Sequence, residues 1–142
     1  MSLPADDNAP IDGACHCGAV RFRVRLTGGI ADARRCNCSY CGMRGAVALT
    51  ARIGDLEILS GADRLNEYRF NTKQARHFFC ASCGIYTHHQ RRSNASEYGV
   101  NAACLGISPF DFAAVPVMDG VHHPSDTGED REVGILRFTA TG

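Results

Sequence analysis

The eight cysteines of this 142-residue chain fall into three short clusters and one isolated position. The clusters read CHCG at 15–18, CNCSYCG at 36–42 and CASCG at 80–84, and the isolated residue is Cys104. Thiolates spaced C-x-C or C-x-x-C can bind one metal ion, because an extended segment or a turn places both sulfurs on one side. Each cluster ends in Cys-Gly, and glycine permits the tight turn that points backbone N–H groups at a thiolate. The spacing therefore indicates committed metal sites.

The first and third clusters together supply four thiolates, which complete the ligand set of a closed tetrahedral zinc site. These ligands are Cys15, Cys17, Cys80 and Cys83. A zinc ion held in this way is structural, and it links the start of the chain to its middle. Disulfides or buried thiols are the alternative, but the paired spacing in a chain expected in a reducing compartment favours zinc.

The middle cluster supplies three thiolates, Cys36, Cys38 and Cys41, and leaves a fourth coordination position for water, a substrate or another side chain. A protein ligand could be Cys104, or one of the histidines at positions 16, 77, 88, 89, 122 and 123. Because Cys104 shares one face of an alternating segment with apolar residues, we expect it in the core. A single histidine in a strand or loop is more often a hydrogen-bonded or surface residue than a ligand. An open fourth position is the pattern of a catalytic zinc site.

Arginines flank this triplet at positions 34, 35 and 44. Their charges can offset the negative charge of three thiolates, or bind the carboxylates of an incoming ligand. Any one of them alone is also explained as a solvated surface charge. We expect Arg44, together with its neighbour Tyr40, to bind the substrate.

Short extended segments must position these side chains. In AVRFRVRL at 19–26, Val20, Phe22 and Val24 alternate with arginines, which is the pattern of a half-buried strand. Further strands are expected at 46–51, 56–59, 67–70, 76–79, 85–90, 98–105 and 133–138, separated by Gly, Asp, Asn and Ser. Ser108 and Pro109 can begin one short helix, and 117–132 has the composition of a long surface loop. The predicted fold class is mainly β with short helical turns.

Length and composition narrow the possibilities further. A chain of 142 residues with 44% hydrophobic residues suits one compact domain, which we place at 13–142 after a flexible arm at 1–12. Fifteen basic and fifteen acidic residues give no net charge, so nucleic acid and anionic membranes are not expected partners. The N-terminal residues lack an apolar run and no stretch reaches membrane-spanning length, so we expect a cytoplasmic protein. The sequence does not specify an oligomeric state.

The order of the motifs resembles the family of glutathione-dependent formaldehyde-activating enzymes and centromere protein V. The pattern G-x-C-x-C-G-x-V-x-F occurs at 13–22, C-x-C-S-x-C at 36–41 and F-C-x-x-C-G at 79–84. With SPFDF at 108–112, the resemblance covers roughly 13–116. It implies a zinc-containing, mainly β fold like that of the Mss4 group, with a structural zinc on the four cysteines and a catalytic zinc on the triplet.

The resemblance also implies an activity, the addition of glutathione to formaldehyde, which is formally a carbon-sulfur lyase reaction in reverse. The substrate thiol would take the fourth position at the triplet and lose its proton there. Many family members carry tryptophans in the last third, whereas this chain has none and carries VMDGVHHPSD at 117–126. The wall of the site is therefore expected to differ. A zinc-stabilised binding module without catalysis is the alternative, and a redox or metal-storage role is a third possibility.

Overall fold

The alternating apolar residues near the N-terminus form the buried face of a strand, as the sequence predicts. The computed structural model describes residues 9–70 and 74–142, and in it β2 (Arg21–Val24) buries Phe22 and Val24 completely. β2 lies between β1 (Ile11–Ala14) and β5 (Leu56–Ser60) in an antiparallel three-stranded sheet. β1 begins at Ile11, two residues before the predicted start of the domain. This sheet places Cys15, which follows β1, in a buried position.

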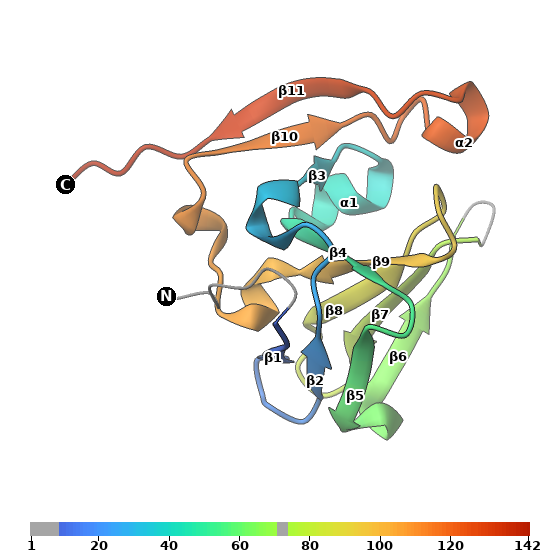
Figure 1. The fold of residues 1–142 in the computed structure, drawn as a ribbon, viewed down its shortest axis with the longest axis vertical. Coiled ribbons are helices and arrows are strands. Elements are labelled where there is room, and N and C mark those ends of the chain that lie inside the picture. The colour runs from blue at the N-terminus through green and yellow to red at the C-terminus, as the bar shows by residue number, and fades with distance from the viewer. Residues whose placement is uncertain (1–8, 71–73) are drawn as a thin grey trace.

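A five-stranded antiparallel sheet with the order β4-β9-β8-β7-β6 forms the centre of the molecule (Figure 1). Its strands are β4 (Ala48–Arg52), β6 (Leu65–Tyr68), β7 (Arg76–Cys80), β8 (Tyr86–Gln90) and β9 (Glu97–Asn101). All five were predicted, with ends that differ by a few residues. The largest difference is in β9, predicted to continue to residue 105. The side chain of Asn101 accepts the N–H of Ala103 at 3.2 Å and begins a 3₁₀ turn, Ala102–Leu105, that ends the strand.

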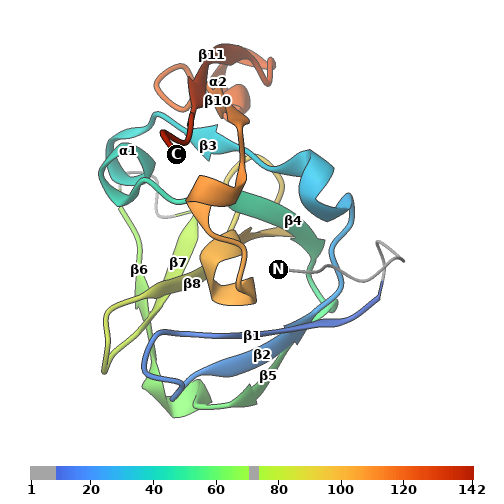
Figure 2. The same cartoon turned by 90° about the vertical axis from the view of Figure 1, so that its left-hand side faces the viewer.

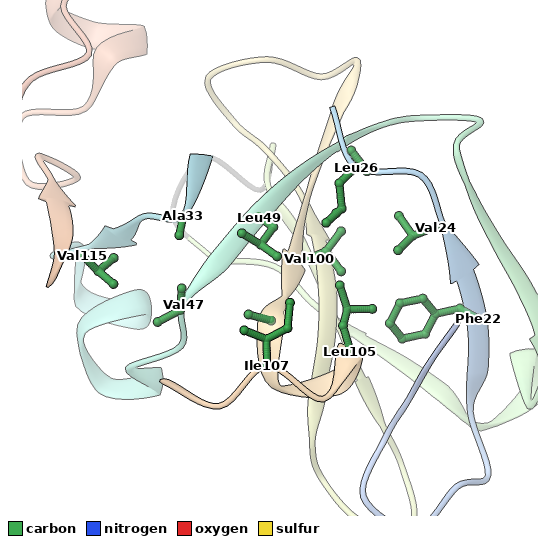
Figure 3. Close-up of a cluster of buried hydrophobic side chains, with 12 residues drawn as sticks. Phe22, Val24, Leu26, Ala33, Val47, Leu49, Val100, Leu105, Ile107 and Val115 are labelled. Atoms are coloured by element: carbon green, nitrogen blue, oxygen red, sulfur yellow. The ribbon is translucent and has the colours of Figure 1, made fainter. Parts of the chain in front are cut away.

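The first two sheets enclose one hydrophobic core (Figure 3). Its buried members are Phe22, Val24, Leu26, Ala33, Val47, Leu49, Ala51, Val100, Ala102, Leu105, Ile107 and Val115. Each large side chain buried in this way contributes about 1.5–3 kcal/mol to folding. Cys104 packs against this core from the 3₁₀ turn, and its thiol donates to the carbonyl of Tyr86 at 3.4 Å. Cys104 thus packs with the core, although it lies in a turn and not in the predicted strand.

A third sheet includes both ends of the stretch predicted as a long surface loop at 117–132, and the residues between are mostly loop, with one short helix. It contains β3 (Arg35–Cys36), β10 (Ala114–Met118) and β11 (Glu132–Arg137) in the order β11-β10-β3, with β10 antiparallel to β11 and parallel to β3. Residues 117–132 therefore include the end of β10, helix α2 (Pro124–Thr127) and the start of β11. The strand β10 was not predicted; it contains Pro116, and proline argues against a strand that is paired on both sides.

The β10–β11 hairpin lies along one end of the molecule, with β3 and helix α1 (Ser39–Arg44) between it and the five-stranded sheet (Figures 1 and 2). The predicted helix at Ser108 is one 3₁₀ turn, Pro109–Asp111, closed by a capping box between Ser108 and Asp111. Eleven strands and two short α-helices in the described residues confirm a single compact, mainly β domain. Among those residues, no helix has the length and apolar character needed to cross a membrane.

Candidate metal centre and the cleft beside it

The four cysteines predicted as one ligand set come together from distant parts of the chain. The sulfurs of Cys15, Cys17, Cys80 and Cys83 all lie within 4.8 Å of one another. The sulfur of Cys17 is 3.7 Å from that of Cys15 and 3.8 Å from that of Cys80. Tetrahedral zinc with bonds of about 2.3 Å requires sulfurs roughly 3.8 Å apart, so this group fits a zinc ion.

Two glycine turns shape this group. Gly18 and Gly84 adopt positive φ angles of 79° and 78°, a region that is unfavourable for other residues. The turns close through hydrogen bonds from Gly18 N–H to the carbonyl of Cys15 at 3.1 Å and from Gly84 N–H to the carbonyl of Cys80 at 2.8 Å. Gly42 of the middle cluster lies inside α1, so a glycine turn of this kind is wrong for that cluster.

Backbone N–H groups also point at these sulfurs. The N–H of Ser82 donates to the sulfur of Cys80 at 3.3 Å. The N–H groups of Cys17 and Ile85 lower the pKa of Cys83 to about 6. Such donors stabilise thiolate over thiol, which is the form that binds a metal. The first group is therefore a closed set of four sulfurs with a supporting shell of amides.

The second group contains Cys36, Cys38 and Cys41, whose sulfurs also lie within 4.8 Å of one another. Cys36 ends β3, and Cys38 is the N-cap of α1, where its sulfur accepts the N–H of Cys41 at 3.3 Å. Hydrogen bonds from the thiols of Cys36 and Cys41 lower the pKa of Cys38 to about 2. In the described part of the chain, no fourth Cys, His, Asp or Glu belongs to this group. Backbone N–H groups point at the sulfurs of both Cys36 and Cys38.

Arg44, in the last turn of α1, is a cation that contacts this group. Its Nη2 donates to the sulfur of Cys41 at 3.3 Å, and its Nη1 donates to Nδ1 of His77 at 3.0 Å. The guanidinium carbon lies 3.7 Å from the ring centroid of Tyr86 and 5.0 Å from that of Tyr40. Arginine has no acceptor atom, so His77 must accept through Nδ1 and carry its proton on Nε2. Arg44 is thus fixed between the sulfur of Cys41 and a ring stack.

The ring stack places neutral histidines beside the triplet. The ring of His77 lies 4.5 Å from that of Tyr40, 5.7 Å from that of Phe70 and 5.2 Å from that of His89. Burial, together with the charge of Arg44, lowers the pKa of His77 to about 4. Burial and the same cation hold the pKa of His89 well below its ordinary value. Both rings are therefore uncharged at neutral pH.

The loop after β10 covers the triplet from the opposite side. A Cβ atom on Gly120 would lie 2.4 Å from the sulfur of Cys36 and 2.8 Å from the Cβ of Cys38, so a larger residue does not fit there. The N–H of Gly120 donates to the side-chain oxygen of Asn37 at 2.8 Å. Next to it, Asp119 is buried and accepts the N–H of His122 at 2.8 Å. These contacts hold the loop against the cysteines.

Arg131 strengthens this anchor, because its Nη2 donates to Asp119 at 2.7 Å. The N–H of His122 and the guanidinium of Arg131 lower the pKa of Asp119 to about 2. The carboxylate therefore stays charged and hydrogen bonded over the whole physiological pH range. The loop is a fixed wall built around one buried acid.

These elements border a cleft of about 390 Å³. Its lining includes the triplet, two aspartates, Asp119 and Asp130, and the arginines at positions 34, 35, 44, 91 and 92. Arg34 pairs with Asp130 at 2.8 Å. The side chain of Arg91 is only 10% exposed and its Nη1 binds Glu97, but its Nη2 is buried without a partner among the described residues. Arg92 pairs with Asp126 at 2.7 Å, so Arg35 and Arg44 are the lining arginines that have no acidic partner among the described residues. Their charges suit a ligand that has carboxylates.

The sequence anticipated part of this site. Arg44 lines the cleft with the triplet, whereas Tyr40 is not among the lining residues and its ring packs against His77 at a tilt of 37°. Sequence reasoning missed Arg91 and Gly120 as site residues. Gly120 could have been suspected only if the preceding strand β10 had been recognised beside Cys36. Arg91 carried no signal, because nothing local ties it to cysteines far away in the chain.

Comparisons with known proteins point to one family. The sequence profile of the family "Glutathione-dependent formaldehyde-activating enzyme" matches residues 10–115. A Halomonas elongata protein named "Putative glutathione-dependent formaldehyde-activating enzyme" is 32% identical over 81 residues, which cover 51% of each chain. The chain thus spans about half the length of this curated relative. A crystal structure of a Rhodobacter sphaeroides protein matches with a TM-score of 0.74 and 57% identity over 75% of this chain and 99% of that chain.

Proposed function

The chain belongs to the glutathione-dependent formaldehyde-activating enzyme family, and we propose that it is a zinc-dependent, carbon-sulfur lyase-like enzyme. It forms or cleaves the adduct of a small thiol such as glutathione with a small aldehyde such as formaldehyde. The main support for this proposal is the difference between the two cysteine groups. One has four sulfurs, and the other has three and borders the cleft. We further propose a cytoplasmic location, where thiols stay reduced.

Zinc suits both donor sets because each consists only of thiolates. Cys15, Cys17, Cys80 and Cys83 would hold a structural ion, and the triplet would hold a second, catalytic ion. At the triplet, bound zinc would supply a Lewis acid at which a thiol loses its proton near neutral pH.

The residues around the triplet have separate roles in this proposal. Arg44 offsets the thiolate charge and contacts the bound substrate. His77 accepts from Arg44 through Nδ1 and is neutral, so it positions Arg44 and does not act as an imidazolium acid. Tyr40 acts through both of them, because its ring packs on His77 and lies beneath the guanidinium. Arg91 lines the same cleft, and its Nη2 is buried without a partner among the described residues.

The proposed reaction needs no oxidant. The thiol sulfur forms a bond to the carbonyl carbon of the aldehyde, and the electron pair of the C=O double bond moves to oxygen. The proton that the thiol loses balances the proton that this oxygen gains. Holding both reactants in one cleft removes most of the entropic cost of bringing them together.

Metal content is the first test. Elemental analysis of protein made with ample zinc should give up to two zinc ions per chain, one for each cysteine group. A content near zero after a gentle preparation would contradict the metal assignment.

Thiol binding is the second test, and it separates the enzyme from a zinc-stabilised binding module. Cobalt replaces zinc in the purified protein, and added glutathione should change the absorption of the cobalt-thiolate centre. Cys38→Ser should abolish this change, whereas Cys104→Ser, at a cysteine outside both groups, should keep it. Exchange NMR should then show faster thiol-formaldehyde adduct formation than in buffer. If no added thiol changes the cobalt spectrum, the binding module becomes the better proposal.

A further inference from the structure

The strand β11 lies at the edge of its sheet. In the order β11-β10-β3 it has one neighbour, and no other described strand pairs with its outer side. Alternate N–H and C=O groups of such a strand point away from the sheet and can pair with another strand. Figure 1 shows β11 along the outer side of the hairpin at one end of the molecule.

The side chains of this edge are unusually apolar for an exposed strand. Val133, Ile135 and Leu136 are 46%, 47% and 53% exposed. Phe138, just after the strand, is 44% exposed, and its ring lies 5.2 Å from that of Phe110, which is 68% exposed. Exposed edges usually carry lysine or proline, which prevent pairing. β11 has neither, and its charged residues are confined to its two ends, Glu132 and Arg137.

A β-bulge gives this strand a property that its sequence alone does not have. Two copies of one strand can pair antiparallel about a twofold axis only if paired residues lie on the same face. Glu132 and Arg137 are five residues apart and would point to opposite faces of a regular strand. In β11, however, Glu132 pairs with Met118 and Gly134 pairs with Val117, which leaves Val133 as an extra residue.

Because Val133 is the extra residue of the bulge, the side chains of Glu132 and Arg137 point to the same face of the strand. Glu132, Ile135 and Arg137 lie opposite Met118, Pro116 and Ala114, which are alternate residues of β10. The three side chains share one face, with Ile135 midway between the two charges. The strand is self-complementary: turned by a twofold axis at Ile135, it places Glu132 beside Arg137 of the second copy and Gly134 opposite Leu136 of the second copy.

We propose that β11 is the dimerisation edge of this protein, where it pairs antiparallel with β11 of a second copy of the chain. The pairing buries the apolar residues of both edges and joins the two three-stranded sheets into one. Because one strand pair buries little area compared with obligate dimers, the association depends on protein concentration.

Sedimentation velocity of the full zinc-loaded chain over a range of concentrations tests the proposal. We expect a concentration-dependent dimer. Glu132→Arg and Arg137→Glu should each raise the dimer dissociation constant about tenfold or more, since each turns two attractive pairs into repulsive ones. An equal mixture of these two variants should associate again. In the mixed dimer the two substituted side chains have opposite charges and face each other, and the unchanged Glu132 of one variant faces the unchanged Arg137 of the other.

Glu129→Arg is the matched control, since it makes the same charge change at an exposed residue outside β11 and should leave the dimer intact. Circular dichroism checks that each variant is folded. If one of the variants is unfolded, Ile135→Lys takes its place, because it puts two like charges next to each other at the twofold axis. A chain that stays monomeric at every concentration overturns the proposal. So does a dimer that tolerates the reversals, or a mixture of the two variants that fails to associate.

Discussion

Arg44 is the residue at which the thiolate triplet, the ring stack and the cleft meet. Its two terminal nitrogens have different partners, the sulfur of Cys41 and Nδ1 of His77, and a lysine cannot reach both with one ammonium group. The histidine is neutral because the cation next to it and its own burial both oppose a second positive charge. The single side chain of Arg44 thus helps to fix the charge state of its neighbour His77.

Replacing Arg44 should change the titration of His77. Burial lowers the pKa of His77 from 6.5 to about 4 with the help of the Arg44 charge. In Arg44→Met burial still lowers the pKa and the charge of Cys38 still raises it, so without the cation the pKa should rise from about 4 toward 6.5, as measured by NMR of the ring protons in zinc-loaded protein. Arg76→Met is the control, because Arg76 acts on His88 and should shift the pKa of that ring instead.

Gly120 should tolerate no side chain. A Cβ there would lie 2.4 Å from the sulfur of Cys36, whereas a Cβ on Gly134 would meet nothing within 4 Å. Gly120→Ala should therefore alter the cobalt spectrum of the triplet and weaken thiol binding about tenfold or more. Gly134→Ala should leave both unchanged. An unaltered spectrum in Gly120→Ala would mean that the loop does not press on the metal ligands.

At the scale of elements, β7 and β8 are the strands that carry buried histidines. The pKa values of His77 and His88 fall from 6.5 to about 4, mainly through burial. Between these two pH values the unfolded chain binds more protons than the folded chain. The stability that these residues contribute is therefore present above pH 6.5 and is lost as the pH falls toward 4.

The expected result is a thermal midpoint that falls steadily between pH 6.5 and 4. The shift of His88 corresponds to on the order of 3 kcal/mol. His88→Phe keeps ring contacts with Phe78 and Tyr98 but removes one titrating group, so its midpoint should fall less steeply. Because both proteins lose zinc equally at low pH, the difference in slope isolates the histidine. Equal slopes would mean that His88 is not titrating in this range.

Elements also show what the sequence could predict and where it failed. The strand with Phe22 and Val24 was predictable because alternation is a local signal with one physical meaning. The cysteine groups were predictable because the metal chemistry restricts spacing. β10 was not, since Pro116 within it argues against a paired strand. Gly120 is placed against the cysteines by that strand, so its role as a wall of the cleft could not be predicted either.

At the scale of the whole molecule, the four-cysteine group joins two hairpins that are otherwise distant in sequence. Cys17 and Cys80 are 63 positions apart, and their sulfurs are 3.8 Å apart. The triplet, by contrast, lies within one short segment next to α1. Loss of the first group should therefore affect the fold, and loss of the second should affect the cleft.

Cys80→Ser should consequently destabilise the domain far more than Cys38→Ser. Loss of even about 3 kcal/mol of metal-coupled folding energy lowers the thermal midpoint by roughly 10 °C in a domain of this size. Cys38→Ser should lose less, and Cys104→Ser serves as the control for a cysteine outside both groups. Thermal denaturation followed by circular dichroism measures all three. Equal losses in Cys80→Ser and Cys38→Ser would remove the distinction between a structural and an open site.

The hairpin that completes the cleft has a consequence for how such a site can diverge. The family match ends at residue 115, whereas Gly120 and Asp119, which form the wall opposite the triplet, come after it. Metal chemistry and the facing wall are thus carried by separate, consecutive parts of the chain. A cassette of residues 117–131 moved into another family member should therefore change thiol preference, and it should leave the metal ligands undisturbed only if glycine is kept at position 120, which packs directly on Cys36 and Cys38.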